Sequence, residues 1–177
     1  QIFRDSTLPL NLFLDDVARI NPYRVPGTAV FMASSPTGTP PVLLHHLKHN
    51  KVLHERVVIL TVQTSNEPVV ATEDRVEVIQ LGRGYWRVIG RYGFMETPNI
   101  HDMLARCGEQ QLPFSMAETT FFLGRETLVP SQHSRLGKWR RDWFISLSHS
   151  ASATKTFFRI PPNRAIELGK HAMEDQL

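Results

Sequence analysis

Residues 25–64 carry the pattern of a strand, a loop, a short helix and a second strand, and this pattern restricts the fold more than any other stretch. From Thr28 to Ala33 nearly every residue is apolar, which is typical of a strand buried on both faces of a sheet covered by helices. A second apolar run at residues 56–64 predicts the second strand. The unit is therefore predicted to be a β-α-β crossover, which is right-handed in nearly all proteins.

The helix inside this unit is expected to begin at two consecutive prolines. Pro40 and Pro41 fit a first helical turn, which tolerates missing N–H donors, and Thr39 is the expected N-cap. The apolar face of the helix consists of Val42, Leu43, Leu44 and Leu47. The histidines and Lys48 of this helix fall largely outside that face.

The rest of the chain alternates further helices and strands. We expect a helix that enters at residues 6–9 and stops before Asn21, a β-hairpin of residues 75–81 and 85–94 with a turn at 82–84, a helix from Thr97 to Gly108, a strand at 119–123, an amphipathic helix at 136–152 and a short strand at 164–168. The predicted fold class is α/β, with a mixed sheet flanked by helices, a central β-hairpin and a C-terminal amphipathic helix. Residues 1–177 are expected to form one domain, with a core at about 8–130, a helical extension at about 136–160 and a return segment at about 164–169.

Composition excludes several classes of protein. The formal charge of +3 is spread along the chain apart from small basic clusters, so no stripe for binding nucleic acid is expected. No apolar run approaches the roughly 20 residues of a membrane span, and the first residues do not resemble a signal peptide. A single cysteine fits a reducing compartment. Because Gln1 is not a natural start, we expect the chain to be a piece of a longer protein.

No catalytic set is visible, so we do not expect an enzyme. Cys107 lies on the apolar stripe of its helix, where a buried structural thiol is the favoured interpretation. The GxSxG, GxxxxGK[ST] and strand-coupled GxGxxG motifs are absent. No cofactor is predicted.

Four histidines lie close together in the sequence and raise the question of a metal site: His45, His46, His49 and His54. The HExxH motif is absent, and a zinc site would need a third protein ligand and a second shell that holds the ligands in place. We favour a solvated, basic helix surface over a metal site.

The loop at residues 34–39 is the best candidate for a ligand site. It lies between the carboxyl end of a strand and the start of a helix, where ligands of open α/β sheets bind and where helices attract anions. The candidate residues are Ser34, Ser35, Thr37, Gly38 and Thr39, with Arg83 as the cation chosen from four arginines (Arg83, Arg87, Arg91 and Arg125). The prolines remove some donors, so a plain connection remains the favoured interpretation.

Five long stretches resemble the C-terminal cytoplasmic region of bacterial KUP-type potassium uptake proteins (the KUP/HAK/KT family). They are VPGTAVFMASS, LLHHLKHNKVLHERVVILTV, WRVIGRYGFMETPNI, ETTFFLGRETLVPS and FFRIPPNRAIELG, and the resemblance covers about residues 8–169. The departures are confined to SSPTGTPP and residues 131–137, which have the composition of variable connections.

The resemblance implies a domain of a proton-coupled potassium transporter on the cytoplasmic side of the bacterial inner membrane. Potassium would be carried through a LeuT-like membrane part and would not bind to this chain. The resemblance implies the membrane part of the same transporter and a second copy as partners, because members of the wider family form homodimers. Some bacterial relatives are inhibited by cyclic di-AMP, but no ligand motif of the family can be placed here residue by residue.

Three functional hypotheses follow. The first is a regulatory and dimerising cytoplasmic domain of the transporter, and the second is a nucleotide-sensing module, with cyclic di-AMP as an example. The third is a small stand-alone enzyme, which would need a polar pocket with paired titratable groups. The C-terminal aromatic stripe around Trp139 and Trp143 either covers the sheet, which we favour, or rests on a membrane.

Overall fold

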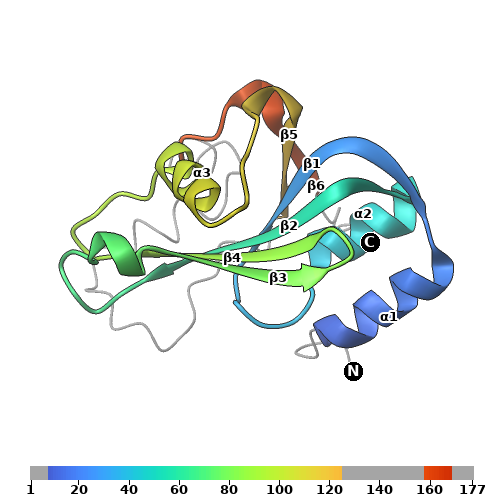
Figure 1. Cartoon of the computed structure of the whole chain (residues 1–177), viewed down its shortest axis with the longest axis horizontal. Helices are drawn as coiled ribbons and strands as arrows, with labels where there is room; N and C mark the ends of the chain where they lie inside the picture. The colour runs from blue at the N-terminus through green and yellow to red at the C-terminus, as the bar shows by residue number, and fades with distance from the viewer. Residues whose placement is uncertain (1–7, 125–157, 169–177) are drawn as a thin grey trace, which may run out of the picture.

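The computed structural model describes residues 8–124 and 158–168, which form a six-stranded sheet with helices on both faces (Figure 1). The helices are α1 (Leu10–Ile20), α2 (Pro41–Asn50) and α3 (Ile100–Glu109). The strands are β1 (Tyr23–Ala33), β2 (Val52–Thr64), β3 (Val76–Gly82), β4 (Tyr85–Tyr92), β5 (Thr119–Gly124) and β6 (Ala165–Leu168). The mixed α/β fold class predicted from the sequence is confirmed.

The strand order is β3-β4-β2-β1-β5-β6, so the longest strands lie in the middle of the sheet. Strands β4, β2, β1, β5 and β6 run parallel to one another, and β3 pairs antiparallel with β4 as the predicted hairpin. Helix α2 connects β1 to β2, which confirms the β-α-β unit, and α3 lies in the connection from β4 to β5. Parallel neighbours place the loops that follow β1, β2 and β4 at one end of the sheet.

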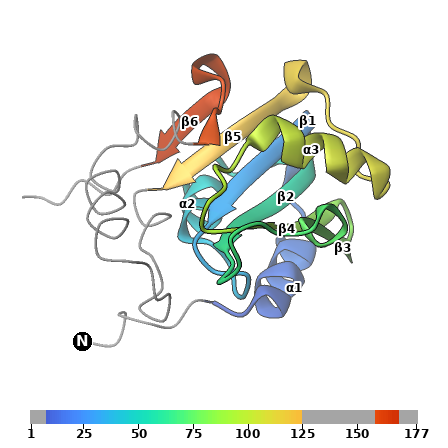
Figure 2. The same cartoon turned by 90° about the vertical axis from the view of Figure 1, so that its left-hand side faces the viewer.

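A separate hydrophobic core covers each face of the sheet. On β2, Val57 and Ile59 contribute to the core that packs under α1 and α2. Their neighbours Val58 and Leu60 contribute to the core under α3. Figure 2 shows α3 and α1 on opposite sides of the sheet. Each of these β2 side chains is fully buried, and complete burial of such a side chain stabilises a fold by about 1.5–3 kcal/mol.

Several boundaries differ from the sequence predictions. Strand β4 ends at Tyr92 rather than at residue 94, and α3 begins at Ile100 rather than at Thr97. Strand β2 begins at Val52 rather than at residue 56, because Leu53 is buried and pairs with Arg24 of β1. The N-cap of α2 is Pro40 and not Thr39, whose side chain makes no capping hydrogen bond. Helix α3 continues through Gly108, and its turn to a positive φ comes later, at Gln111.

The hairpin turn needs its glycines. Gly82, Arg83 and Gly84 all have positive φ angles, of 85°, 53° and 82°. A Cβ atom on Gly84 would lie 2.4 Å from the backbone oxygen of Glu55, and the Gly84 carbonyl accepts a hydrogen bond from the Val57 N–H at 2.8 Å. The turn is therefore fitted closely against β2.

The structure describes only part of the C-terminal region in which a helix and a strand were predicted. The short strand expected at residues 164–168 is present as β6, which pairs with β5. The expected amphipathic helix at 136–152, with Trp139 and Trp143, lies outside the described residues.

Candidate functional site

The loop of residues 34–39 lies at the carboxyl end of β1, and short polar contacts hold its shape. The Ser35 hydroxyl accepts a hydrogen bond from the Thr37 N–H at 3.2 Å and lies 3.1 Å from the Thr37 hydroxyl. The N–H of Thr39 donates to the carbonyl of Leu8 at 2.9 Å, which fastens the end of the loop to the segment before α1. Gly38 has a φ angle of 78°, a conformation that favours glycine.

Arg87, from β4, binds the inner side of this loop. Its guanidinium donates hydrogen bonds to the carbonyl of Pro36 and, at 3.0 Å, to the carbonyl of Gly38. The hydroxyl of Thr61, from β2, donates to the carbonyl of Ser35 at 3.1 Å. Burial lowers the pKa of Arg87 from its usual value. Three strands therefore meet at the loop, and its carbonyls are turned toward the protein rather than toward solvent.

The predicted cation is at the other end of the sheet. Arg83 is exposed in the turn before β4, whereas the loop follows the last residue of β1, and these strands run parallel through β2. The structure thus brings together Ser34, Ser35, Thr37, Gly38 and Thr39 but not Arg83. The signal that points to Arg87 is its place between Tyr85 and Ile89, two buried residues on the same strand face, whereas Arg91 follows them nearer the end of the strand.

The start of α2 offers few hydrogen-bond donors. Pro40 and Pro41 have no N–H, and no described side chain caps the helix. Two polar atoms near the loop are buried without a hydrogen-bond partner among the described residues: the Thr39 hydroxyl oxygen and the Nε atom of Arg87. An anion or a polar ligand is the chemistry that such donors can serve, whereas a nucleophile paired with a base is not among the groups at this loop.

The histidines overturn the prediction of a fully solvated basic surface. His46 is only 3% exposed and its ring packs against Phe31 and Phe122, 5.3 and 4.6 Å away between centroids. The ring of His54 lies 6.2 Å from that of His46 and also contacts Phe122. Helix α2 thus buries a histidine because two aromatic residues from β1 and β5 form its surroundings, while His49 stays exposed and His45 is half-buried.

Burial shapes the chemistry of this pair. Desolvation lowers the pKa of both rings, and the neighbouring His54 lowers that of His46 further. The Nδ1 atom of His46 lies 2.9 Å from the side-chain amide nitrogen of Asn50, whereas His46 Nε2 and His54 Nδ1 have no partner among the described residues. No group of three or more histidine, cysteine or acidic residues in the described part of the chain is arranged to hold a metal ion.

Cys107 lies on the buried face of α3. Burial raises the pKa of its thiol to about 12, so the thiolate that a nucleophile requires is not formed at neutral pH. Its environment agrees with the structural role predicted from the sequence.

Comparison with known proteins shows the family of this chain. Residues 26–173 match the profile of a family described as the K+ potassium transporter C-terminal domain. The chain belongs to this family. The KUP-type resemblance noted in the sequence is thereby confirmed.

The relatives of this potassium transporter C-terminal domain are much longer proteins. A probable potassium transport system protein Kup from Myxococcus xanthus is 51% identical over 166 residues, which are 94% of this chain and 25% of that protein. A protein of the same description from an Anaeromyxobacter species is 49% identical over 173 residues, or 95% of this chain and 26% of that protein. A Kup 2 protein from Syntrophobacter fumaroxidans is 46% identical over 164 residues, with 93% and 26% covered.

This chain therefore spans about a quarter of the length of the curated relatives it matches. No solved structure matches it. None of the helices in the described ranges is both long enough and apolar enough to cross a membrane.

Proposed function

We propose that this chain is a cytoplasmic regulatory and dimerisation domain of a proton-coupled potassium uptake transporter. The observation that carries the proposal is the family match over residues 26–173, together with relatives named as Kup potassium transport proteins of which this chain corresponds to a quarter. The ion path then lies in the membrane part, and potassium does not bind here. We further propose that the domain is not an enzyme, in line with relatives that are named as transporters.

A domain of this kind acts by binding differently to two states of the transporter. A contact that is equally strong in both states shifts nothing, however tight it is. The rigid sheet supports such a role, because two cores fix its strands and leave loops at both ends for contact with a partner. Dimerisation supplies a second route, since a paired domain couples the two transporter subunits.

The test is removal of the domain from the full-length transporter. In a bacterium that lacks its own potassium uptake systems, we expect the shortened transporter to reach the membrane but to differ several-fold from the intact one in rubidium uptake. We also expect less dimer in chemical crosslinking of membranes. Identical uptake and an identical dimer fraction would refute both halves of the proposal.

Nucleotide sensing is the second candidate function, and it is favoured by the buried hydroxyl of Thr39, which has no hydrogen-bond partner in the described part of the chain. With cyclic di-AMP, AMP, ADP or ATP at a hundred times its dissociation constant, a ligand of this chain would add about 2.7 kcal/mol to the free energy of unfolding. We expect Thr39→Val to abolish such a thermal shift if the ligand binds at the loop. Arg83→Ala serves as the control, since Arg83 lies at the other end of the sheet. If neither these nucleotides nor potassium changes the thermal stability of the chain, the domain is a scaffold without a nucleotide site.

A further inference from the structure

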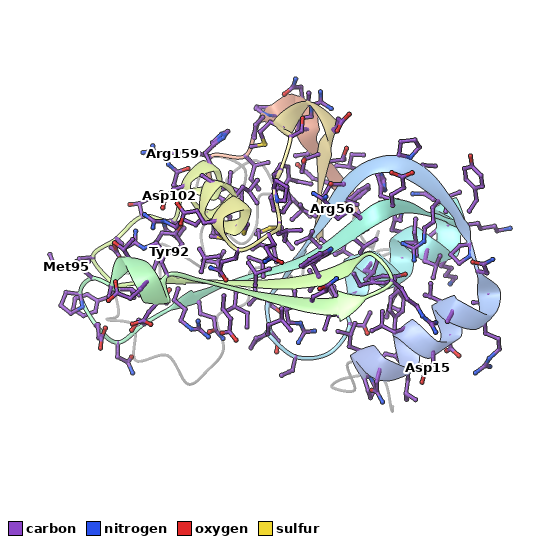
Figure 3. All side chains as sticks on the ribbon, in the orientation of Figure 1. Asp15, Arg56, Tyr92, Met95, Asp102 and Arg159 are labelled. Atoms are coloured by element: carbon purple, nitrogen blue, oxygen red, sulfur yellow. The ribbon has the colours of Figure 1, made fainter. Side chains whose placement is uncertain are left out.

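The ends of β2 and β4 carry a second surface that the loop of residues 34–39 does not use. Two loops, 65–75 and 93–96, meet there, and we call them together the β2–β4 tip. The tip exposes three apolar side chains, with Val69 61%, Phe94 37% and Met95 71% accessible to solvent. Figure 3 shows Met95 at one extremity of the molecule, pointing away from the sheet. Clustered, exposed apolar side chains mark surfaces that bind a partner.

Backbone contacts hold the two loops together. The N–H groups of Phe94 and Met95 donate to the carbonyls of Glu67 and Pro68 at 2.9 and 3.1 Å. A Cβ atom on Gly93 would lie only 2.1 Å from the Pro68 oxygen, so this close approach requires glycine. The apolar residues are therefore carried on a fixed frame rather than on separate loops.

A partly buried ion pair between Glu96 and Arg75 also holds the two loops together. The carboxylate of Glu96 accepts hydrogen bonds from the N–H groups of Gly93 and Val70 at 2.7 and 3.1 Å and is paired with Arg75. The Arg75 guanidinium also donates to the Val70 carbonyl at 2.9 Å and lies over the ring of Tyr92. Burial alone would raise the pKa of Glu96, but these hydrogen bonds and Arg75 together lower it, so the carboxylate stays charged. A surface ordered before binding loses less entropy when a partner docks.

The tip is acidic although the chain as a whole is basic. Its two loops contain four acidic residues and one arginine, a formal charge of −3 against +3 for the whole chain. Glu67, Glu73 and Asp74 are exposed, whereas Glu96 is already paired. Apolar side chains that share two loops with exposed carboxylates call for a partner with apolar and basic groups.

We propose that the β2–β4 tip docks on a Lys- and Arg-bearing cytoplasmic loop of the transporter's membrane part; this inference rests on the proposed function. Loops on the cytoplasmic side of membrane proteins carry an excess of lysine and arginine. An anionic lipid surface would repel the tip's carboxylates. A second copy of the tip would bring two charges of −3 together. Charge therefore selects the basic loop over lipid and over a second tip.

Photocrosslinking in the full-length transporter tests the contact directly. Met95 is replaced by p-benzoylphenylalanine, membranes are irradiated, and the crosslinked peptides are identified by mass spectrometry. We expect a crosslink to a loop between membrane spans that carries lysine or arginine. A crosslink to lipid, to the tip of a second copy, or to no protein at all would overturn the proposal.

Charge reversal at the tip gives an independent readout. With the photoreactive residue at 95, we expect Glu67→Lys with Asp74→Lys to lower the crosslink yield about tenfold, the change that about 1.4 kcal/mol of binding free energy produces. The matched control is Asp15→Lys with Glu118→Lys, two exposed acidic residues outside the tip, for which the yield should not change. Equal yields in the two double variants would contradict a charge-selected contact.

Failure of the tip proposal can be distinguished from failure of the proposed function. If removal of the domain alters rubidium uptake but charge reversal at the tip leaves both the crosslink and uptake unchanged, the tip proposal is wrong and the proposed function stands. If removal of the domain changes nothing, the proposed function fails first. Circular dichroism of the chain with each double variant confirms that these exposed substitutions leave the fold intact.

Discussion

At the residue scale, the buried pair of His46 and His54 makes stability depend on pH. Burial lowers the pKa of both rings in the folded chain, whereas the unfolded chain titrates near 6.5. The unfolded state therefore binds more protons in acid. The contribution of the neutral pair is fully present above about pH 6.5 and is lost as pH falls from there through the folded pKa values.

We predict that the free energy of unfolding falls as pH drops below about 6.5, by at most about 1.4 kcal/mol per pH unit for each histidine. The polar neighbours of the pair are the Asn50 amide, the Arg24 guanidinium, which donates to the His54 carbonyl at 2.9 Å, and the backbone of Val52. The Val52 hydrogen bond raises the pKa of His46, but burial and the neighbouring His54 lower it more. Urea titrations across this range give the slope.

The quantity to compare among variants is the slope of the free energy of unfolding against pH, and not the free energy at one pH. His46→Gln should flatten it, because one of the two titrating groups is gone while a polar side chain remains beside Asn50. His49→Gln, on the exposed side of α2, is the matched control and should leave the slope as in the parent chain. A parent chain whose stability does not change between pH 7 and pH 5 would contradict the prediction.

His46 also shows what a sequence pattern misses. The apolar face of α2 was predicted correctly for Val42 and Leu43, because their spacing alone places them on one side. The burial of His46 depends on Phe31 and Phe122, which are far apart in the sequence and become neighbours only when β1 pairs with β5. In the same way, the choice between Arg83 and Arg87 required the order β4-β2-β1, which no local pattern contains.

At the element scale, the two glycines of the β3–β4 turn differ in why they are needed: both have positive φ angles, but only Gly84 also lies close to another backbone segment. Gly82 and Gly84 both have positive φ, so alanine is strained at either position, at a cost of about 1 kcal/mol. Only at Gly84 would the new Cβ also meet backbone, 2.4 Å from the Glu55 oxygen, whereas at Gly82 it would meet no atom of the described residues within 4 Å. We predict that Gly84→Ala lowers the free energy of unfolding clearly more than Gly82→Ala, measured by urea denaturation.

Equal losses in these two variants would mean that the turn moves away from β2 at no cost. That result would also conflict with the hydrogen bond from the Val57 N–H to the Gly84 carbonyl, which a displaced turn must break. The turn itself was predictable, because two glycines between alternating strands are a strong signal. The start of β2 at Val52 was not, because Lys48, Lys51 and Arg56 mask a strand that pairs with β1 through Leu53.

At the scale of the whole molecule, both hydrophobic cores include side chains of the same central strand, β2. Strand β2 pairs with β1 on one side and with β4 on the other, and alternate residues along it face opposite cores. A destabilising substitution in either core therefore weakens the packing of the same central strand. Single domains of fewer than about 150 residues usually unfold in one cooperative step. The shared central strand gives a structural reason for such a step here.

We predict that Ile59→Ala, on the α1 and α2 face, and Leu60→Ala, on the α3 face, each lower the free energy of unfolding by about 2–5 kcal/mol. Native-state hydrogen exchange should then speed up together in β1, β2 and β4 in both variants. Ile79→Ala, 36% exposed on the edge strand β3, is the control and should change stability by less than about 1 kcal/mol. Faster exchange confined to α3 in Leu60→Ala, or to α1 and α2 in Ile59→Ala, would mean that the faces open separately. A domain that opens face by face would transmit a contact at the β2–β4 tip poorly, because β2 and β4, the strands that end at this tip, contribute residues to both cores.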